Sequence, residues 1–135
     1  MKKLTTALMT KFNETDGGVH NSLYTLVSGK MYKERAPQDA APPYIVYHII
    51  SDVPDWTFDT DFERVRIQFN LYSDEESSSE VEDIYAALRS VYEWKELTVE
   101  DWSHVYMRRE LARLSKDPED DMWVWAVDYE ILVEQ

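Results

Sequence analysis

The sequence predicts an α+β fold: a single domain with a mainly antiparallel sheet and helices packed on one face. Residues 62–72 (FERVRIQFNLY) alternate apolar and polar side chains, which is typical of a long strand with one buried face. Residues 79–93 instead carry apolar side chains at the spacing of an amphipathic helix. Residues 122–133 alternate again. A strand that leads into a helix able to lie back on it, followed by a further strand pair, is an α+β arrangement.

Composition supports one folded domain over residues 1–135 and excludes several classes of function. The chain is 44% hydrophobic and contains nine Tyr and five Trp, which argues against disorder. It has no Cys, so disulfides, thiolate zinc sites and thiol nucleophiles are excluded. No apolar run reaches the length of a membrane span, and the Met-Lys-Lys start lacks the apolar segment of a secretion signal. We therefore expect a protein of a reducing cytoplasm with no membrane partner.

The net charge of −13 restricts the partners further. DNA and anionic membranes repel an acidic surface, so neither is expected to bind by charge attraction. The simpler interpretation of the charge is solubility. A more specific interpretation is a surface that lies beside nucleic acid without retaining it, and composition alone favours the simpler one.

The N-terminal third predicts short elements separated by Gly, Ser and Pro. Leu4, Ala7, Leu8 and Phe12 have helical spacing. Three prolines in residues 36–43 fix φ and remove backbone donors, which indicates a loop. In order, we expect a helix at 3–13, a break at Gly17 and Gly18, a helical turn from Asn21 or Ser22 to Val27, a short strand at 30–35 and a loop at 36–43.

The middle of the chain predicts a long antiparallel hairpin. Residues 44–50 (YIVYHII) are apolar on both sides, which indicates a central strand with both faces covered, near a subunit contact. Residues 51–61 are predicted to form a polar loop that contains Pro54. Residues 62–72 then return as the second strand.

The C-terminal half predicts a helix and a second hairpin. Ser79 followed by Glu82 has the pattern of a capping box. After a connection at 94–101, residues 102–114 alternate but are also partly compatible with a helix; we prefer a strand because 122–133 offers a partner, across a DPEDD turn. The apolar stripe of the helix consists of Val81, Ile84, Tyr85, Leu88, Val91 and Tyr92.

No motif for catalysis or cofactor binding occurs in the sequence. His20, His48 and His104 lie in three different segments, and none belongs to an HExxH pattern. The acidic residues 117–121 lack the glycine and the closing Glu of an EF-hand loop. GxSxG, P-loop and GxGxxG patterns are absent, and three Gly leave little room for a phosphate cradle. We therefore expect no catalytic, metal or cofactor site, and a protein that is not an enzyme.

The basic residues predict pairing across the sheet more than an anion site. Arg64 and Arg66 share one strand face and are expected to pair with acids such as Asp128 and Glu130. Acids surround the one positive cluster, which makes it weak as a nucleic-acid patch. That cluster consists of Arg108, Arg109, Arg113 and Lys116.

Aromatic residues in connecting segments are the most distinctive feature. Trp56 and Phe58 lie in the predicted polar loop, and Trp94 and Trp102 flank the connection after the helix. The simpler interpretation is that these loops fold back and bury their rings. The alternative is that the rings anchor contacts with neighbouring subunits. The candidate interface comprises four residues of the loop: Trp56, Phe58, Asp55 and Asp59.

The order of these segments resembles the tail-completion family of long-tailed double-stranded DNA phages and prophages, whose members are tail terminators or head–tail joining proteins. The resemblance covers residues 29–135. Its most specific parts are the run APQDAAPPYIVYHIIS at 36–51 and the strand, serine loop and helix at 65–92. A late aromatic strand ending in DYEILVE completes the pattern.

The resemblance implies a structural virion protein with no catalytic residues, made in the cytoplasm of a bacterial host. Such proteins form a ring, typically a hexamer, at the head-proximal end of the tail tube, where they stop tube growth. The implied partners are further copies of the chain, the tail tube protein and the head-completion or connector protein, while DNA passes through the ring without specific binding. Two other hypotheses remain: a non-catalytic soluble adaptor that uses exposed aromatic loops, and a small hydrolase with an acidic site.

Overall fold

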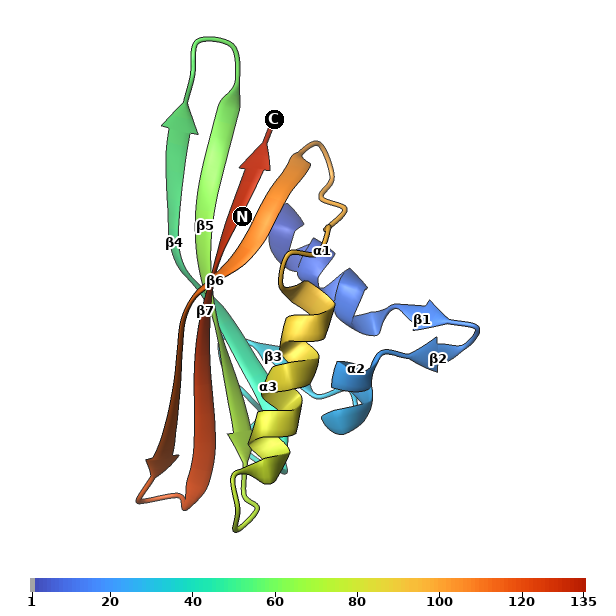
Figure 1. The fold of residues 1–135 in the computed structure, drawn as a ribbon, viewed down its shortest axis with the longest axis vertical. Helices are drawn as coiled ribbons and strands as arrows, with labels where there is room; N and C mark the ends of the chain where they lie inside the picture. Colours follow the sequence, from blue (N-terminus) through green and yellow to red (C-terminus); the bar gives the residue numbers. More distant parts are fainter. Residues whose placement is uncertain (1) are drawn as a thin grey trace.

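The computed structural model describes residues 2–135 and shows one twisted sheet with helices on one side (Figure 1). The predicted α+β fold is confirmed. The elements are, in chain order, α1 (Lys2–Asn13), β1 (Thr15–Asp16), β2 (Val19–His20), α2 (Ser22–Leu26), β3 (Met31–Lys33), β4 (Tyr44–Trp56), β5 (Asp61–Ser73), α3 (Ser79–Tyr92), β6 (Ser103–Asp117) and β7 (Met122–Glu134).

The main sheet has five strands in the order β3-β4-β5-β7-β6, with β1 and β2 forming a separate small hairpin. The β3–β4 pair is parallel and the other pairs of the main sheet are antiparallel. Strand β3 pairs only with Ile45, Val46 and Tyr47, so the rest of β4 has no strand on its outer side within the described chain. The prediction of a central strand with both faces covered at 44–50 is confirmed at Ile45, Val46 and Tyr47, which are buried where β4 lies between β3 and β5. It is wrong at Ile50, which is exposed where β4 has no outer neighbour.

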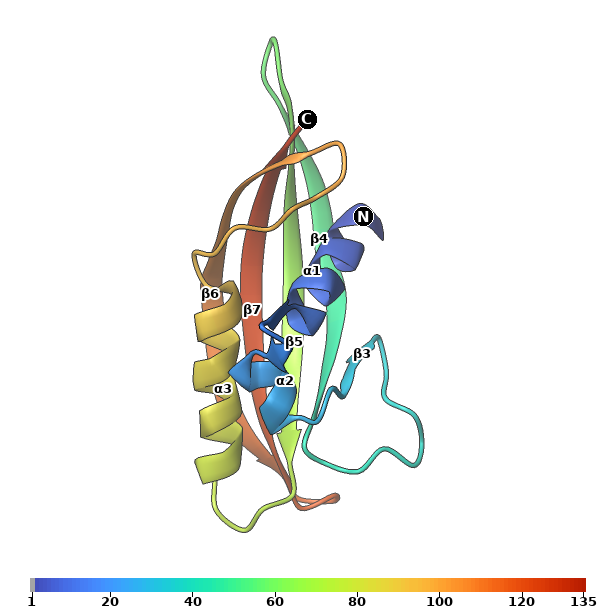
Figure 2. The same ribbon diagram turned by 90° about the vertical axis from the view of Figure 1, so that its right-hand side faces the viewer.

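The core lies between the sheet and the helices, which cover one face only; the helices lie on one side of the sheet in Figure 1 and across it in Figure 2. Alternation predicts this face correctly, because Phe69 of β5 lies opposite Val127 of β7, and both side chains are buried. Tyr92 of α3 stacks on Phe69 at 5.3 Å between ring centroids and donates a hydrogen bond to the Leu8 carbonyl of α1 at 2.8 Å. One aromatic side chain thus joins the sheet to both helices.

Helix α2 begins as the sequence predicts, at a side-chain cap. The Tyr24 amide donates to Asn21 Oδ1 at 2.9 Å, and Asn21 Nδ2 donates to the Phe12 carbonyl at 3.1 Å. The cap therefore also fixes α2 to the end of α1. Gly29 ends the segment with φ of +72°, and a Cβ there would lie 2.8 Å from the end of the Tyr24 side chain, so the position favours glycine.

Helix α3 carries the predicted apolar stripe, but the predicted capping box is wrong. Ser79 is the first helical residue, and the preceding Ser78 makes no side-chain cap bond. The first turn is instead tied to the sheet, because the buried Ser73 hydroxyl at the end of β5 donates to Glu80 at 2.7 Å. Consecutive serines offer several alternative caps, and the contact with β5 decides where the helix starts.

The strand prediction for residues 102–114 is confirmed, since β6 pairs with β7 from Ser103 to Asp117. The predicted turn at 117–121 is also confirmed, with the Glu119 amide donating to Asp117 at 2.9 Å. Within the described chain, no helix covers the second face of the sheet, which we call the open face (Figure 1).

The largest difference from the sequence prediction is the length of the first hairpin. Residues 51–56, predicted as loop, continue β4 after a bulge between Ile49 and Ser51 and stay paired as far as Trp56 with Asp61. Pro54 is tolerated because β4 has no neighbouring strand on its outer side there, so no ladder hydrogen bond is lost on that side. The hairpin extends beyond the rest of the sheet (Figure 1).

Candidate functional site

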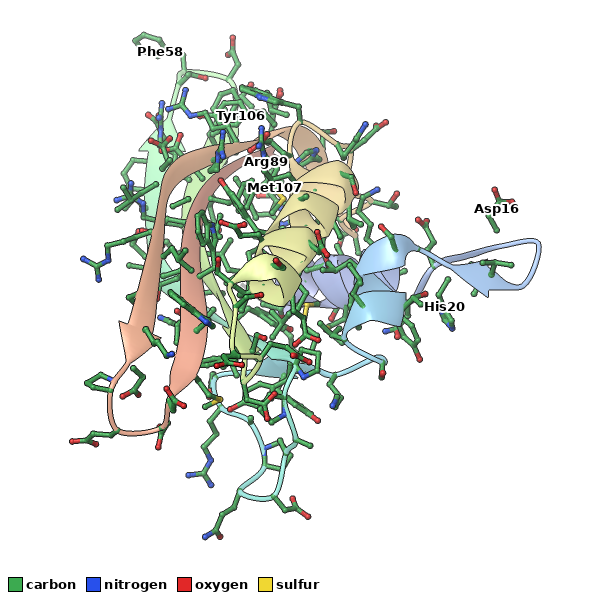
Figure 3. All side chains as sticks on the ribbon, turned by 60° about the horizontal axis from the view of Figure 1, so that its bottom comes forward. Asp16, His20, Phe58, Arg89, Tyr106 and Met107 are labelled. Atoms are coloured by element: carbon green, nitrogen blue, oxygen red, sulfur yellow. The ribbon has the colours of Figure 1, made fainter. Side chains whose placement is uncertain are left out.

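The end of the β4–β5 hairpin, residues 55–61, is called the hairpin tip below. A tight loop closes it, in which the Thr57 amide donates to the Thr60 carbonyl at 3.0 Å and the Thr60 amide donates to Thr57 Oγ1 at 3.2 Å. Trp56 is 71% exposed and Phe58 is fully exposed. Figure 3 shows Phe58 at the extreme end of the hairpin, away from the body. The two rings project on a short, hydrogen-bonded loop.

Carboxylates surround these two rings. Asp55 accepts a hydrogen bond from Arg64 Nε at 3.0 Å. Within residues 2–135, the side chains of Asp59 and Asp61 make no hydrogen bond or ion pair. The hairpin tip therefore combines exposed aromatic area with unneutralised negative charge.

The four loop aromatics have different fates. Trp56, Phe58 and Trp94 are exposed, so the interpretation that their rings fold back into the body is wrong for these three. Trp102 is half-buried and packs against the core, so the same interpretation is confirmed there. The sequence places all four in connections and has no signal that separates them.

A row of charges crosses the open face next to the hairpin tip. Arg64 of β5 pairs with Asp55 of β4 at 3.0 Å and with Glu130 of β7 at 3.5 Å. Arg108 of β6 pairs with the same Glu130 at 3.2 Å and with Glu110 at 2.8 Å. Each exposed pair contributes little alone. Together they link four strands and hold the hairpin base in register.

The predicted pairing with acids across the sheet is confirmed for Arg64, which pairs with Glu130, and is wrong for Arg66. Arg66 lies opposite Glu130 in the register but forms no ion pair within the described residues. Asp128 accepts a hydrogen bond from Gln68 at 2.8 Å instead. Glu130 also accepts from the Tyr106 hydroxyl; burial, and then this bond, raise the pKa of Tyr106.

The basic cluster of the sequence is divided between the two faces of the sheet. Arg108 lies on the open face, whereas Arg109 points to the helix side, where it pairs with Glu93 at 3.1 Å and contacts the Tyr85 hydroxyl. Lys116 pairs with Asp121 at 3.2 Å. Because neighbouring strand residues face opposite ways, the cluster makes no continuous positive patch.

The three histidines lie in different surroundings. His20 stacks on Tyr24 at 3.6 Å, and His48 is half-buried on β4. His104 accepts a hydrogen bond from the Leu97 amide at 3.3 Å, and burial lowers the pKa of its imidazole. Among residues 2–135, no three His or carboxylate side chains are grouped to hold a metal ion. Nor does this part of the chain contain a helix with the length and apolar character of a membrane span.

Comparison with protein families gives one match. The model of the family described as Tail completion protein gp17 matches residues 19–134. The chain belongs to this family. By this family it is a structural protein of a phage-type tail. The structural role of the family also agrees with the expectation that the chain is not an enzyme.

A solved structure shows the same fold. A chain of the virion of a native gene transfer agent particle superposes with a TM-score of 0.84, covering 98% of this chain and 95% of that chain. The two are 14% identical, so the similarity concerns the fold. A search of curated protein sequences found no match.

Proposed function

We propose that the protein forms a ring at the head-proximal end of the tail tube, where it ends tube growth and joins the tail to the head connector. The proposal rests on the family and on one observation: Trp56 and Phe58 project from a closed hairpin end in which no core needs them. Large exposed aromatic side chains are typical anchors of protein contacts. The partners are further copies of the chain, the tube protein and the connector.

A ring requires that each subunit use two different patches. One patch of each copy meets another patch of the next copy, and the repeated rotation closes the ring. The hairpin tip supplies the first patch. Its aromatic residues Trp56 and Phe58 make the apolar contact. Asp59 supplies the charge that the receiving surface must match, while Asp55, paired with Arg64, lies beside the rings.

The net charge of −13 supports passage of DNA through such a ring. Retention of DNA needs clustered Lys and Arg on phosphates. The basic residues of β6 are divided between two faces and are partly neutralised by Glu93, Glu110 and Asp121. A wall of this kind lets DNA slide past.

The test is to assemble particles in the absence of the protein and to compare them with particles assembled in its presence. Without a terminating ring, we expect tubes longer than normal and without heads in electron micrographs. A matched preparation that carries the exposed Leu111→Ala change, on β6 away from the hairpin tip, keeps tails of normal length. Tails of normal length that still join heads in the absence of the protein would overturn the proposal.

A further inference from the structure

A shallow groove runs beside α1 on the helix side of the molecule. It has a volume of about 680 Å³, and its lining includes Lys2, Thr6 and Met9 of α1 together with Lys33 and Tyr47. A second hollow, of about 320 Å³, shares Lys2 and Thr6 and lies along another side of the helix. Helix α1 is thus flanked by two depressions. Met9 and Tyr47 give the larger one, called the α1 groove below, apolar lining atoms.

The charge of α1 is opposite to that of the whole chain. Its sequence KKLTTALMTKFN carries three Lys and no acid, in a protein with a net charge of −13. Within residues 2–135, Lys2 and Lys33 form no ion pair, although both line the α1 groove. Lys3 is neutralised by Asp101, and Glu14 is the acid among the lining residues. Within the described chain, two lysine ammonium groups without an ion-pair partner therefore border a groove whose other lining side chains are mainly threonines.

The hairpin tip has the complementary properties. The tip is a projection and the α1 groove is a depression, so their shapes can fit. Within the described chain, the tip also carries the unpaired carboxylates of Asp59 and Asp61 beside the exposed rings of Trp56 and Phe58. We propose that the hairpin tip of one copy docks into the α1 groove of the next copy. This inference rests on the proposed ring and names its receiving surface.

The two patches occupy different parts of one molecule, which suits a head-to-tail contact. The tip extends past the end of the sheet, away from its own α1, whereas α1 lies across the helix side of the body (Figures 1 and 2). A contact between two different patches propagates around a ring. The Phe58 and Trp56 rings pack against Met9 and the exposed Thr6 and Thr10 side chains, and the Asp and Lys groups select the partner and its orientation.

The absence of Cys from the chain makes a direct test possible. Phe58→Cys places a thiol at the tip, and Thr6→Cys places one at an exposed position of the α1 groove. After oxidation, a mixture of the two single variants yields a disulfide-linked dimer, and the double variant yields a ladder that ends at the size of the ring. Phe58→Cys mixed with Leu111→Cys, on the open face, yields no dimer above background. The reaction is run on purified protein and on assembled particles.

Reversal of charge tests the polar part of the contact. Lys33→Glu raises the concentration needed for half-maximal ring assembly by about tenfold, because it places like charges together. Adding Asp59→Lys to that variant restores assembly. Arg113→Glu, the same charge change at an exposed β6 position without an ion pair in the described chain, leaves assembly unchanged.

The outcomes separate this inference from the proposed ring. Rings that form normally but show no tip-to-groove disulfide and no effect of Lys33→Glu overturn the docking while the ring stands. A protein that stays monomeric in solution and on tail tubes overturns both. A disulfide between Phe58→Cys and Thr6→Cys with loss and rescue by the charge variants supports the docking.

Discussion

The body of the sheet buries its aromatic side chains in the core, whereas the hairpin tip exposes its aromatic side chains to solvent. In the body, Phe69 is surrounded by the rings of Tyr47, Tyr92 and Tyr129, with centroids 6.0, 5.3 and 6.0 Å away. At the tip, Trp56 and Phe58 contact solvent. Burial of a large aromatic side chain is worth about 1.5–3 kcal/mol, which the body obtains within one chain. The tip obtains it only by contact with another molecule.

The largest expected effect is on the body. Leu88 of α3 is fully buried in the core that faces β5. Leu88→Ala removes this contact and leaves a cavity, so we expect the free energy of unfolding to fall by about 2–5 kcal/mol. Urea denaturation followed by circular dichroism measures the change. A midpoint equal to that of the wild type would show that α3 does not pack on the sheet as described.

A smaller effect is expected at the link between the body and α1. Tyr92→Phe keeps the ring on Phe69 but removes the 2.8 Å hydrogen bond to the Leu8 carbonyl. We expect a loss of about 1 kcal/mol of stability, typical of one buried hydrogen bond. Thermal unfolding measures it, with Tyr32→Phe, on the open face, as the control. An unchanged melting temperature would mean that the bond contributes nothing.

A pH-dependent effect is expected at the base of the hairpin. Burial, and then the neighbouring Asp52 carboxyl, raise the pKa of Glu63. A folded pKa above the unfolded one means that the folded chain binds the proton more tightly, so this group lowers stability as the pH rises from the ordinary Glu range through the raised value. Glu63→Gln therefore raises the melting temperature at neutral pH, and the difference disappears in acid. Glu82→Gln, at an exposed position of α3, serves as the control. A difference that persists in acid would contradict the assignment.

The sequence predicts the body far better than the tip. The sequence predicts the buried face of β5, β7 and α3 correctly. Burial of one face requires apolar side chains at a regular spacing, and this spacing is visible in the sequence. Residues 51–56 of β4 have no such requirement, since both sides are exposed, and Pro54 with its acidic neighbours resembles a loop. Their strand conformation comes from pairing with residues 61–66 of β5, which local sequence does not reveal.

The sequence predicts which residues make up the candidate site, but it does not predict how far they project or that they are exposed. The aromatic residues between acids mark residues 55–59 as unusual for a monomer. Their exposure depends on how far the hairpin extends beyond β7, which ends opposite Phe62. The α1 groove depends on α1, β3 and β4 coming together, and the N-terminal sequence predicts only an amphipathic helix.

The smallest expected effect on stability is at the tip. Trp56→Ala with Phe58→Ala removes rings that touch no core, so the free energy of unfolding should change by less than about 0.5 kcal/mol. Thermal unfolding and far-ultraviolet circular dichroism measure this. A large loss of stability would show that the Trp56 and Phe58 rings contribute to folding, which would contradict the distinction between the body and the tip.

The molar mass of that same double variant tests the central claim, that the tip assembles the ring. Light scattering after size-exclusion chromatography is performed on wild type and variant, alone and after incubation with tail tubes. We expect the wild type to form a closed oligomer of fixed mass, in solution or on the tubes, and the folded variant to remain a monomer under every condition. A variant that forms the same oligomer as the wild type would contradict the account.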